Sequence, residues 1–195
     1  VQIDWATGHC TGPAVCINLG RIARMSISTD SAEEALMAEY VTVDGARVGV
    51  LMGSASDWPT MEKTSQTLEK LGIVHECNVI SAHRAPRRLE SYCSTAEERG
   101  LQVLICAAGG AAHLAGVAAA LTHLPILGCP MNAWSTEGLD SLLSMAQMPK
   151  GIPVGTLAVG SAGAINAAIL AGEIIALSDA TVRDSVLKFR EAQSA

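Results

Sequence analysis

Three polar stretches of this sequence carry side chains that could do chemistry, and each directly follows an apolar run. A loop that leads from a strand into a helix exposes unpaired backbone N–H groups, and the helix dipole adds to their attraction for an anion. Serine hydroxyls and an arginine fork would complete a phosphate site, and a carboxylate would suit sugar hydroxyls. The candidate residues are Ser54, Ser56 and Asp57 in the first stretch, Ser81, His83 and Arg84 in the second, and Ala108, Gly109 and His113 in the third.

The first stretch has two interpretations. Pro59 at the first position of a helix would make residues 53–57 a turn that ends at a helix N-terminus. Small polar residues in that place often do no more than cap the helix. The repetition of the arrangement in two further loops favours an anion site, and Gly109 and Gly110 would let the backbone approach a flat heterocycle closely. Together the three stretches predict a mononucleotide site.

His83 and His113 are the candidate proton carriers. An imidazole near its free pKa can both give and take a proton, so we interpret His83 as a proton shuttle. The alternative is that His83 caps the helix that follows it or bonds locally. His113 is expected in the first turn of a helix, where the dipole disfavours a cation. We therefore expect His113 to be a neutral donor or a packing group.

The elements that would position these residues alternate from Arg47 onward. About five strand–helix units predict an α/β fold, a three-layer sandwich with a parallel sheet of about five strands and a flavodoxin-like or Rossmann-like topology. Ligands of such sheets bind beyond the carboxyl ends of the strands, where the three stretches would meet. The expected strands cover residues 48–52, 73–80, 103–107, 125–129 and 154–159, and the expected helices cover 59–72, 86–100, 111–122, 139–148, 162–177 and a tail from about 179.

The composition and the missing motifs exclude several classes of protein. The chain has 195 residues, of which 49% are apolar and 16% charged, so we expect one folded domain rather than disorder. Its net charge of −6 argues against binding to nucleic acid. No apolar run reaches the ~20 residues that a membrane span needs. The G-x-G-x-x-G and Walker signatures are absent, which sets aside NAD and ATP as default ligands.

The six cysteines include no C-x-x-C pair, so we expect buried, reduced thiols in a cytoplasmic protein. Residues 1–44 are predicted to be an N-terminal extension, and residues 45–195 a single catalytic domain with a C-terminal tail helix. Residues 1–24 show no clear period and precede the first methionine, Met25, so we interpret them as a leader or as sequence added for expression. The pattern Ser31-x-x-Glu34 predicts a capping box for a short helix that carries Tyr40.

Five motifs, in order and without obvious insertions, resemble the PurE family over roughly residues 48–177. The resemblance implies an enzyme of de novo purine synthesis that places a carboxylate on carbon 4 of 5-aminoimidazole ribonucleotide. The motifs are GSASDW at 53–58, SAHRAP at 81–86, GGAAHL at 109–114, GLDSLL at 138–143 and QMPKGIPVGT at 147–156.

The motifs are similar to the bacterial and plant branch of that family. This resemblance implies a mutase that converts 5-(carboxyamino)imidazole ribonucleotide into 4-carboxy-5-aminoimidazole ribonucleotide through a trapped carbon dioxide. It also implies a homo-octamer that needs no metal or organic cofactor, with His83 as general acid and base. The implied substrate-binding residues are Ser54, Ser56, Asp57, Ser81, Arg84, Ala108, Gly109 and His113.

Two alternatives to the mutase stay open. The first is direct carboxylation of 5-aminoimidazole ribonucleotide by carbon dioxide, as in the other PurE class. The second is a non-enzymatic nucleotide-binding module, against which His83 argues because a pure binder needs no proton carrier. The sequence departs from the usual family pattern at Ala107, Ala115 and Trp134, and the extra methyl of Ala107 could narrow the slot for the heterocycle.

Overall fold

The computed structural model describes residues 2–4, 9–11, 40–133 and 135–194, so the expected capping box at 31–34 and Trp134 lie outside the described residues. A five-stranded parallel sheet with the order β4-β3-β5-β6-β7 forms the centre. This is the flavodoxin-like strand order, and it confirms the predicted fold class. The strands are β3 (Val48–Met52), β4 (His75–Val79), β5 (Val103–Ala108), β6 (Ile126–Pro130) and β7 (Gly155–Thr156).

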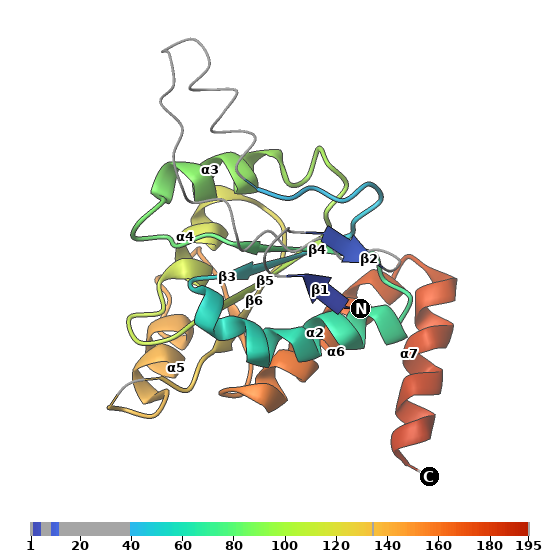
Figure 1. Cartoon of the computed structure of the whole chain (residues 1–195). Helices are drawn as coiled ribbons and strands as arrows, with labels where there is room; N and C mark the ends of the chain where they lie inside the picture. The colour runs from blue at the N-terminus through green and yellow to red at the C-terminus, as the bar shows by residue number, and fades with distance from the viewer. Residues whose placement is uncertain (1, 5–8, 12–39, 134, 195) are drawn as a thin grey trace.

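Helices cover both faces of this sheet, which makes the three predicted layers (Figure 1). One face carries α3 (Pro86–Thr95) and α4 (Leu114–Leu121). The opposite face carries α2 (Trp58–Lys70) and α6 (Ser161–Ala176), and α7 (Ala180–Gln193) packs on α6. Helix α5 (Leu139–Ala146) contacts β6 and β7. A separate antiparallel pair joins β1 (Gln2–Asp4) to β2 (His9–Thr11).

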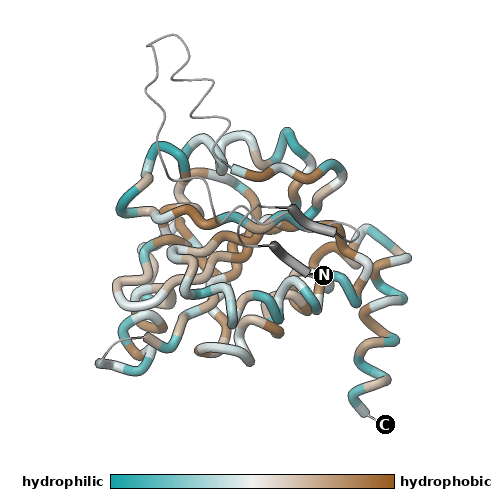
Figure 2. The backbone as a smooth tube through the Cα atoms, in the orientation of Figure 1, coloured by the Kyte–Doolittle hydropathy of each residue, from teal (hydrophilic) through white to brown (hydrophobic). Residues whose placement is uncertain are grey.

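The three central strands β3, β5 and β6 are buried on both faces, because each face of a parallel sheet is covered by helices. In Figure 2 the backbone is coloured hydrophobic along the strands and hydrophilic over many of the outer turns. Successive residues of β3 face opposite cores: Val50 packs in the cluster with α2 and α6, and Leu51 in the cluster with α3 and α4. Four described cysteines are free and buried as expected, namely Cys77, Cys93, Cys106 and Cys129.

Small residues let α6 lie close to its neighbours. A Cβ placed on Gly163 would come within 1.6 Å of the Ala158 carbonyl oxygen, so only glycine fits where the helix meets the preceding loop. At the next residue of α6, the Ala164 carbonyl accepts from the Thr64 hydroxyl of α2 at 2.8 Å. Of the described helices, none is long and apolar enough to cross a membrane.

Several predicted elements are longer than the elements observed, and the largest differences are at β7 and α3. The expected strand 154–159 shrinks to the two residues of β7, although Leu157 N–H still donates to Gly128 O and Gly160 N–H to Pro130 O. Residues 157–160 therefore run beside β6 without the regular hydrogen bonding of a strand. The second helix ends at Thr95 rather than near Gly100, because the following turns bring Arg99 back toward the sheet.

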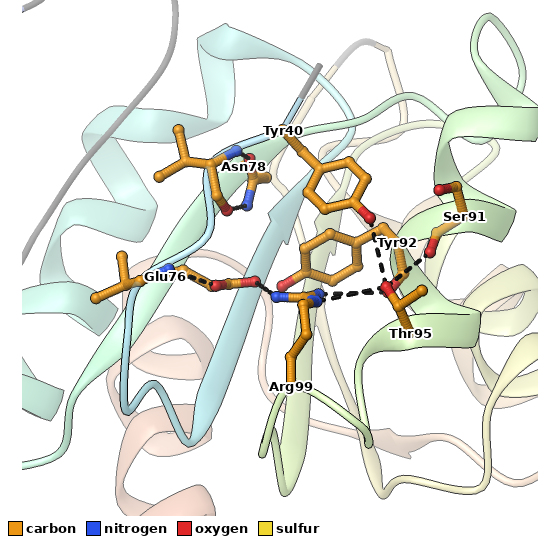
Figure 3. A network of polar contacts seen from close by, with 9 residues as sticks. Tyr40, Glu76, Asn78, Ser91, Tyr92, Thr95 and Arg99 are labelled. Carbon is orange, nitrogen blue, oxygen red and sulfur yellow. Dashed lines mark hydrogen bonds and ion pairs between the residues drawn. The ribbon is translucent and has the colours of Figure 1, made fainter. Parts of the chain in front are cut away.

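A buried ion pair explains that turn (Figure 3). Glu76 on β4 is fully buried, and its Oε1 accepts from Arg99 Nη1 at 2.6 Å. The guanidinium also lies over the ring of Tyr92 at 4.7 Å and over that of Tyr40 at 5.5 Å. The charge of Glu76 is therefore compensated by a cation that is itself sheltered by two aromatic rings.

The segment 40–43, which belongs to the predicted extension, docks on this same network. Val43 N–H donates to the second oxygen of Glu76 at 3.0 Å. Asn78 bonds Val41 twice, accepting from its N–H at 2.7 Å and donating to its carbonyl at 2.9 Å. Side chains of the edge strand β4 therefore satisfy the backbone of a segment that adds no strand to the sheet (Figure 3).

Candidate active site

The loop after β3 folds into a short 3₁₀ turn, η1 (Ala55–Asp57), that leads into α2. Ser54 Oγ accepts from the Ser56 N–H at 3.3 Å and from the Ser56 hydroxyl at 2.9 Å. Asp57 Oδ2 accepts from the Ser54 N–H at 3.1 Å and completes a capping box. The capping interpretation is therefore correct for the bonds within this loop. It leaves the exposed Ser56 and the half-buried Ser54 beside the end of β3, where a ligand could still reach them.

Burial changes the acidity of Asp57. Only 9% of the residue is exposed. Its desolvation raises the pKa to about 6, although the hydrogen bond from Ser54 N–H opposes the shift. This carboxyl group therefore changes charge close to neutral pH, unlike an ordinary surface aspartate.

Arg84 bridges two of the predicted loops. Its backbone N–H and its Nε each donate to Ser81 Oγ at 3.3 Å, and its Nη2 donates to the Gly53 carbonyl at 3.2 Å. The guanidinium is exposed, so its remaining N–H groups can meet a ligand. The expected grouping of Ser81 and Arg84 with the loop after β3 is present.

His83 contacts His113 and does not cap α3. His83 Nε2 and His113 Nδ1 lie 2.9 Å apart, with the rings edge to face at 88°. The N-cap of α3 is Ala85, and no side-chain bond caps that helix, so the capping interpretation of His83 is wrong. His113 lies at the N-cap of α4, close to its expected place in the first turn. Residues 30 positions apart in the chain thus form a histidine pair at the carboxyl edge of the sheet.

The third loop, which follows β5, lies close to the loop after β6. A Cβ on Gly109 would lie 2.8 Å from the Cβ of Ala133, and Gly110 has a φ of 65°, so both positions favour glycine. Ala108 is buried on the α3–α4 side of the sheet. The methyl of Ala107 packs in the cluster on the opposite side, with α2 and α6, so the core accommodates this departure from the family pattern.

Helix α5 adds contacts at the candidate site that were not predicted from the sequence. Ser144 Oγ accepts from the Ala112 N–H at 3.1 Å, and Ser141 Oγ lies 2.8 Å from the Met131 carbonyl. Ser144 thus contacts the third candidate loop, and Ser141 contacts the neighbouring loop after β6. The available signal was two hydroxyl residues three positions apart in a helix that is otherwise mostly apolar.

A cavity of about 710 Å³ lies in another part of the molecule, lined by residues 119–127, 151–153 and Gly155. Most of the described residues that line it are apolar, and His123 is the one titratable side chain among them. We assign the candidate site to the three loops because they bring together the arginine, the histidine pair and the acid. Within the described part of the chain, no group of three or more His, Cys, Asp or Glu side chains could hold a metal.

The strand order and the loops at the carboxyl edge define an α/β protein of the flavodoxin-like class. The chain belongs to the AIR carboxylase family, which its sequence matches over residues 47–195.

Relatives that are similar over most of their length support this assignment. The chain is 53% identical to the N5-carboxyaminoimidazole ribonucleotide mutase of Vibrio vulnificus over 148 residues, which cover 76% of this chain and 92% of the relative. It is 50% identical to the enzyme of the same name from Escherichia coli K12 over 149 residues, covering 76% and 88%. The crystal structure of Treponema denticola PurE has a TM-score of 0.68 and 30% identity, covering 76% of this chain and 92% of that one.

Proposed function

We propose that this protein is an isomerase of purine biosynthesis that converts 5-(carboxyamino)imidazole ribonucleotide into 4-carboxy-5-aminoimidazole ribonucleotide. The relatives named as mutases support this reaction at about half identity over three quarters of the chain. The observation that carries the proposal is the position of His83. It belongs to the same loop as Ser81 and Arg84 and pairs with His113 instead of capping a helix.

Each of the three loops would bind a different part of the substrate. Ser54, Ser56, Ser81 and Arg84 would bind the phosphate through hydroxyls and paired N–H donors. Asp57, when ionised, would accept hydrogen bonds from the ribose hydroxyls. The backbone at Ala108 and Gly109 would lie against the imidazole ring, with His113 beside it. Phosphate binding far from the reacting carbons holds the ring while the carboxylate moves.

His83 would carry one proton out and back. As an imidazolium it protonates the carbamate nitrogen, and the bond between that nitrogen and the carboxylate carbon breaks. Carbon dioxide is released, and the ring becomes an electron-rich aminoimidazole. Carbon 4 then attacks the trapped carbon dioxide, and neutral His83 removes the proton that the new carboxylate displaces. The histidine ends in its starting state, so no net acid or base is consumed. The pocket must exclude water so that carbon dioxide stays near carbon 4.

The contact with His113 supports this assignment. A separation of 2.9 Å leaves room for one hydrogen between the two nitrogens, so both cannot donate at once. One ring nitrogen of the pair therefore carries the hydrogen and the other accepts it, which fixes the orientation of the His83 ring.

A substrate comparison tests the proposal. The purified protein is incubated with the carbamate and, separately, with 5-aminoimidazole ribonucleotide, each with and without bicarbonate. Product from the carbamate without bicarbonate is the expected result. Product only from the aminoimidazole with bicarbonate would indicate direct carboxylation, and binding of either ribonucleotide without turnover would indicate a binding module.

Three further properties belong to the same proposal: catalysis without a metal or organic cofactor, a cytoplasmic location and assembly into a homo-octamer. The free, buried cysteines agree with a reducing compartment. The half-exposed leucines on α5, Leu139 and Leu143, favour burial against another copy.

A further inference from the structure

Helix α5 reaches the candidate site through two serines. Ser144 Oγ accepts from the Ala112 N–H at 3.1 Å. Ser141 Oγ is fully buried and lies 2.8 Å from the Met131 carbonyl and 2.9 Å from the Gly138 carbonyl. Ser141 thus fixes α5 to the loop after β6, and Ser144 links the fixed helix to the loop that carries Gly109 and His113.

The Ser144 hydroxyl is oriented by its own helix. It has one O–H to donate, and the nearest carbonyl is that of Asp140, four residues earlier, at 2.8 Å. The carbonyls of Ser141 and Gly110 lie further away, at 3.2 and 3.5 Å. Donation to Asp140 leaves the oxygen lone pairs of Ser144 free to accept from Ala112. The bond to the helix backbone therefore orients Ser144 Oγ as an acceptor toward the loop 109–113.

The loop depends on this acceptor. Ala112 is fully buried, and Ser144 Oγ is the one acceptor found for its N–H among the described residues. A buried N–H without a partner is unfavourable, so loss of the hydroxyl would favour another loop conformation. Gly109 and Gly110, which precede Ala112, allow such a change because glycine restricts the backbone least.

We propose that Ser144 is a positioning residue that holds the loop 109–113 in the geometry that the reaction needs. The residue after Ala112 is His113, whose Nδ1 meets His83 Nε2 at 2.9 Å. A shift at Ala112 moves this ring and the backbone at Gly109 together. Displacements of about 1 Å at reacting groups can cost up to about 10²-fold in rate. This inference rests on the proposed function for the reaction, whereas the loop geometry can be measured without substrate.

Two substitutions with side chains of nearly the same shape test the role of the Ser144 hydroxyl. Ser144→Thr keeps an oxygen that can bond the helix carbonyl and accept from Ala112, while Ser144→Val has nearly the same shape and no oxygen. Ser185→Ala is the matched control. In α7, Ser185 Oγ makes the same kind of intrahelical bond, to Thr181 O at 3.1 Å, and this bond lies at the surface.

Two readouts are taken at a temperature where all variants are folded: amide hydrogen exchange of residues 108–114 without substrate, and kcat and KM on the carbamate. We expect Ser144→Val to lose at least tenfold of the exchange protection at Ala112 and at least tenfold in kcat. Ser144→Thr and Ser185→Ala should stay within about threefold of the parent. Retention of parental exchange or parental kcat in the valine variant would overturn the proposal, as would a threonine variant as impaired as the valine one. If the parent lacked mutase activity, the proposed function would fail, while hydrogen exchange would still decide whether Ser144 holds the loop.

Discussion

At the scale of single residues, the candidate site separates groups that bind from the one group that would move protons. Arg84 donates to Ser81 Oγ and to the Gly53 carbonyl, whereas the His83 side chain contacts only His113 among the described residues. Substitutions in the two groups should therefore change different measured quantities.

Replacement of His83 by Asn should separate binding from chemistry. Asparagine keeps a hydrogen-bonding group but exchanges no proton at neutral pH. Nucleotide affinity and melting temperature should stay close to the parent, while turnover should fall by ~10²–10⁴-fold. Thermal unfolding, nucleotide binding and turnover are measured on one preparation. Turnover within tenfold of the parent would remove His83 from the proton step and make His113 the next residue to test.

Replacement of Arg84 by Ala should weaken binding of the ribonucleotide and of inorganic phosphate by ~1.5–3 kcal/mol, the range for hydrogen bonds to a charged group. Titration calorimetry of both ligands measures the change. Arg183 on α7 is exposed and distant in the chain, so Arg183→Ala is the control for net charge. Equal affinities in the parent and the Arg84 variant would exclude Arg84 from the site.

Asp57 predicts a pH-dependent stability. Its pKa is raised to about 6 in the folded protein from 3.8, so the unfolded chain releases this proton first as the pH rises. The contribution of Asp57 to folding stability is therefore lost between about pH 4 and pH 6 and stays lost above. Asp57→Asn removes this effect and should be more stable than the parent at pH 7.5 by roughly 1–3 kcal/mol, but not at pH 4. Urea unfolding at the two pH values measures the difference, and a gain of equal size at both would contradict the explanation.

At the scale of the elements, close packing between strands and helices leaves little free volume. A Cβ on Gly49 of β3 would lie 2.3 Å from the Tyr92 hydroxyl and 2.8 Å from Leu104 Cδ2. Gly49→Ala should therefore lower the free energy of unfolding by ~1–3 kcal/mol through overpacking. Tyr92→Phe removes the nearest atom, so the double variant should recover part of the loss. Purely additive effects in denaturant unfolding would show that the Tyr92 contact is not the cause.

The sequence predicted the elements well where burial alone decides them, and less well where contacts between distant segments decide them. Strand β3 matched its apolar run because both faces of a parallel sheet are buried. The end of α3 was wrong by about one turn because Arg99 turns back to pair with the buried Glu76, a partner 23 residues earlier. The short β7 was overestimated because hydrophobicity does not reveal where an edge strand loses its regular pairing.

The same distinction applies to the candidate site. Parallel topology made it predictable that the three loops meet at one edge. The histidine pair and the contact of Ser144 with Ala112 depend on side-chain positions across 30 and 32 residues, which no spacing in the sequence encodes. The raised pKa of Asp57 likewise follows from its burial in the folded chain.

At the scale of the whole molecule, several large apolar side chains remain on the surface of a single chain. Leu139, Leu143, Leu177 and Leu187 are each about half exposed or more. We predict that part of this surface is buried between copies, giving an assembly of eight chains of 20.2 kDa. Multi-angle light scattering should find this mass at micromolar concentration, and a pair of substitutions, Leu139→Glu with Leu143→Glu, should reduce it. A monomer of the parent would contradict the prediction.

The docking of segment 40–43 on Glu76 and Asn78 bears on where the N-terminus of a shortened protein should be placed. A fragment cut at Arg47, where the family match begins, would retain the buried Glu76 carboxylate without the Val43 amide that bonds its second oxygen. It would also leave both hydrogen-bonding atoms of Asn78 without the Val41 backbone. We therefore expect a fragment that starts at or before Tyr40 to be more stable than one that starts at Arg47, and a fusion partner is better joined upstream of Tyr40, where it leaves the docked segment intact.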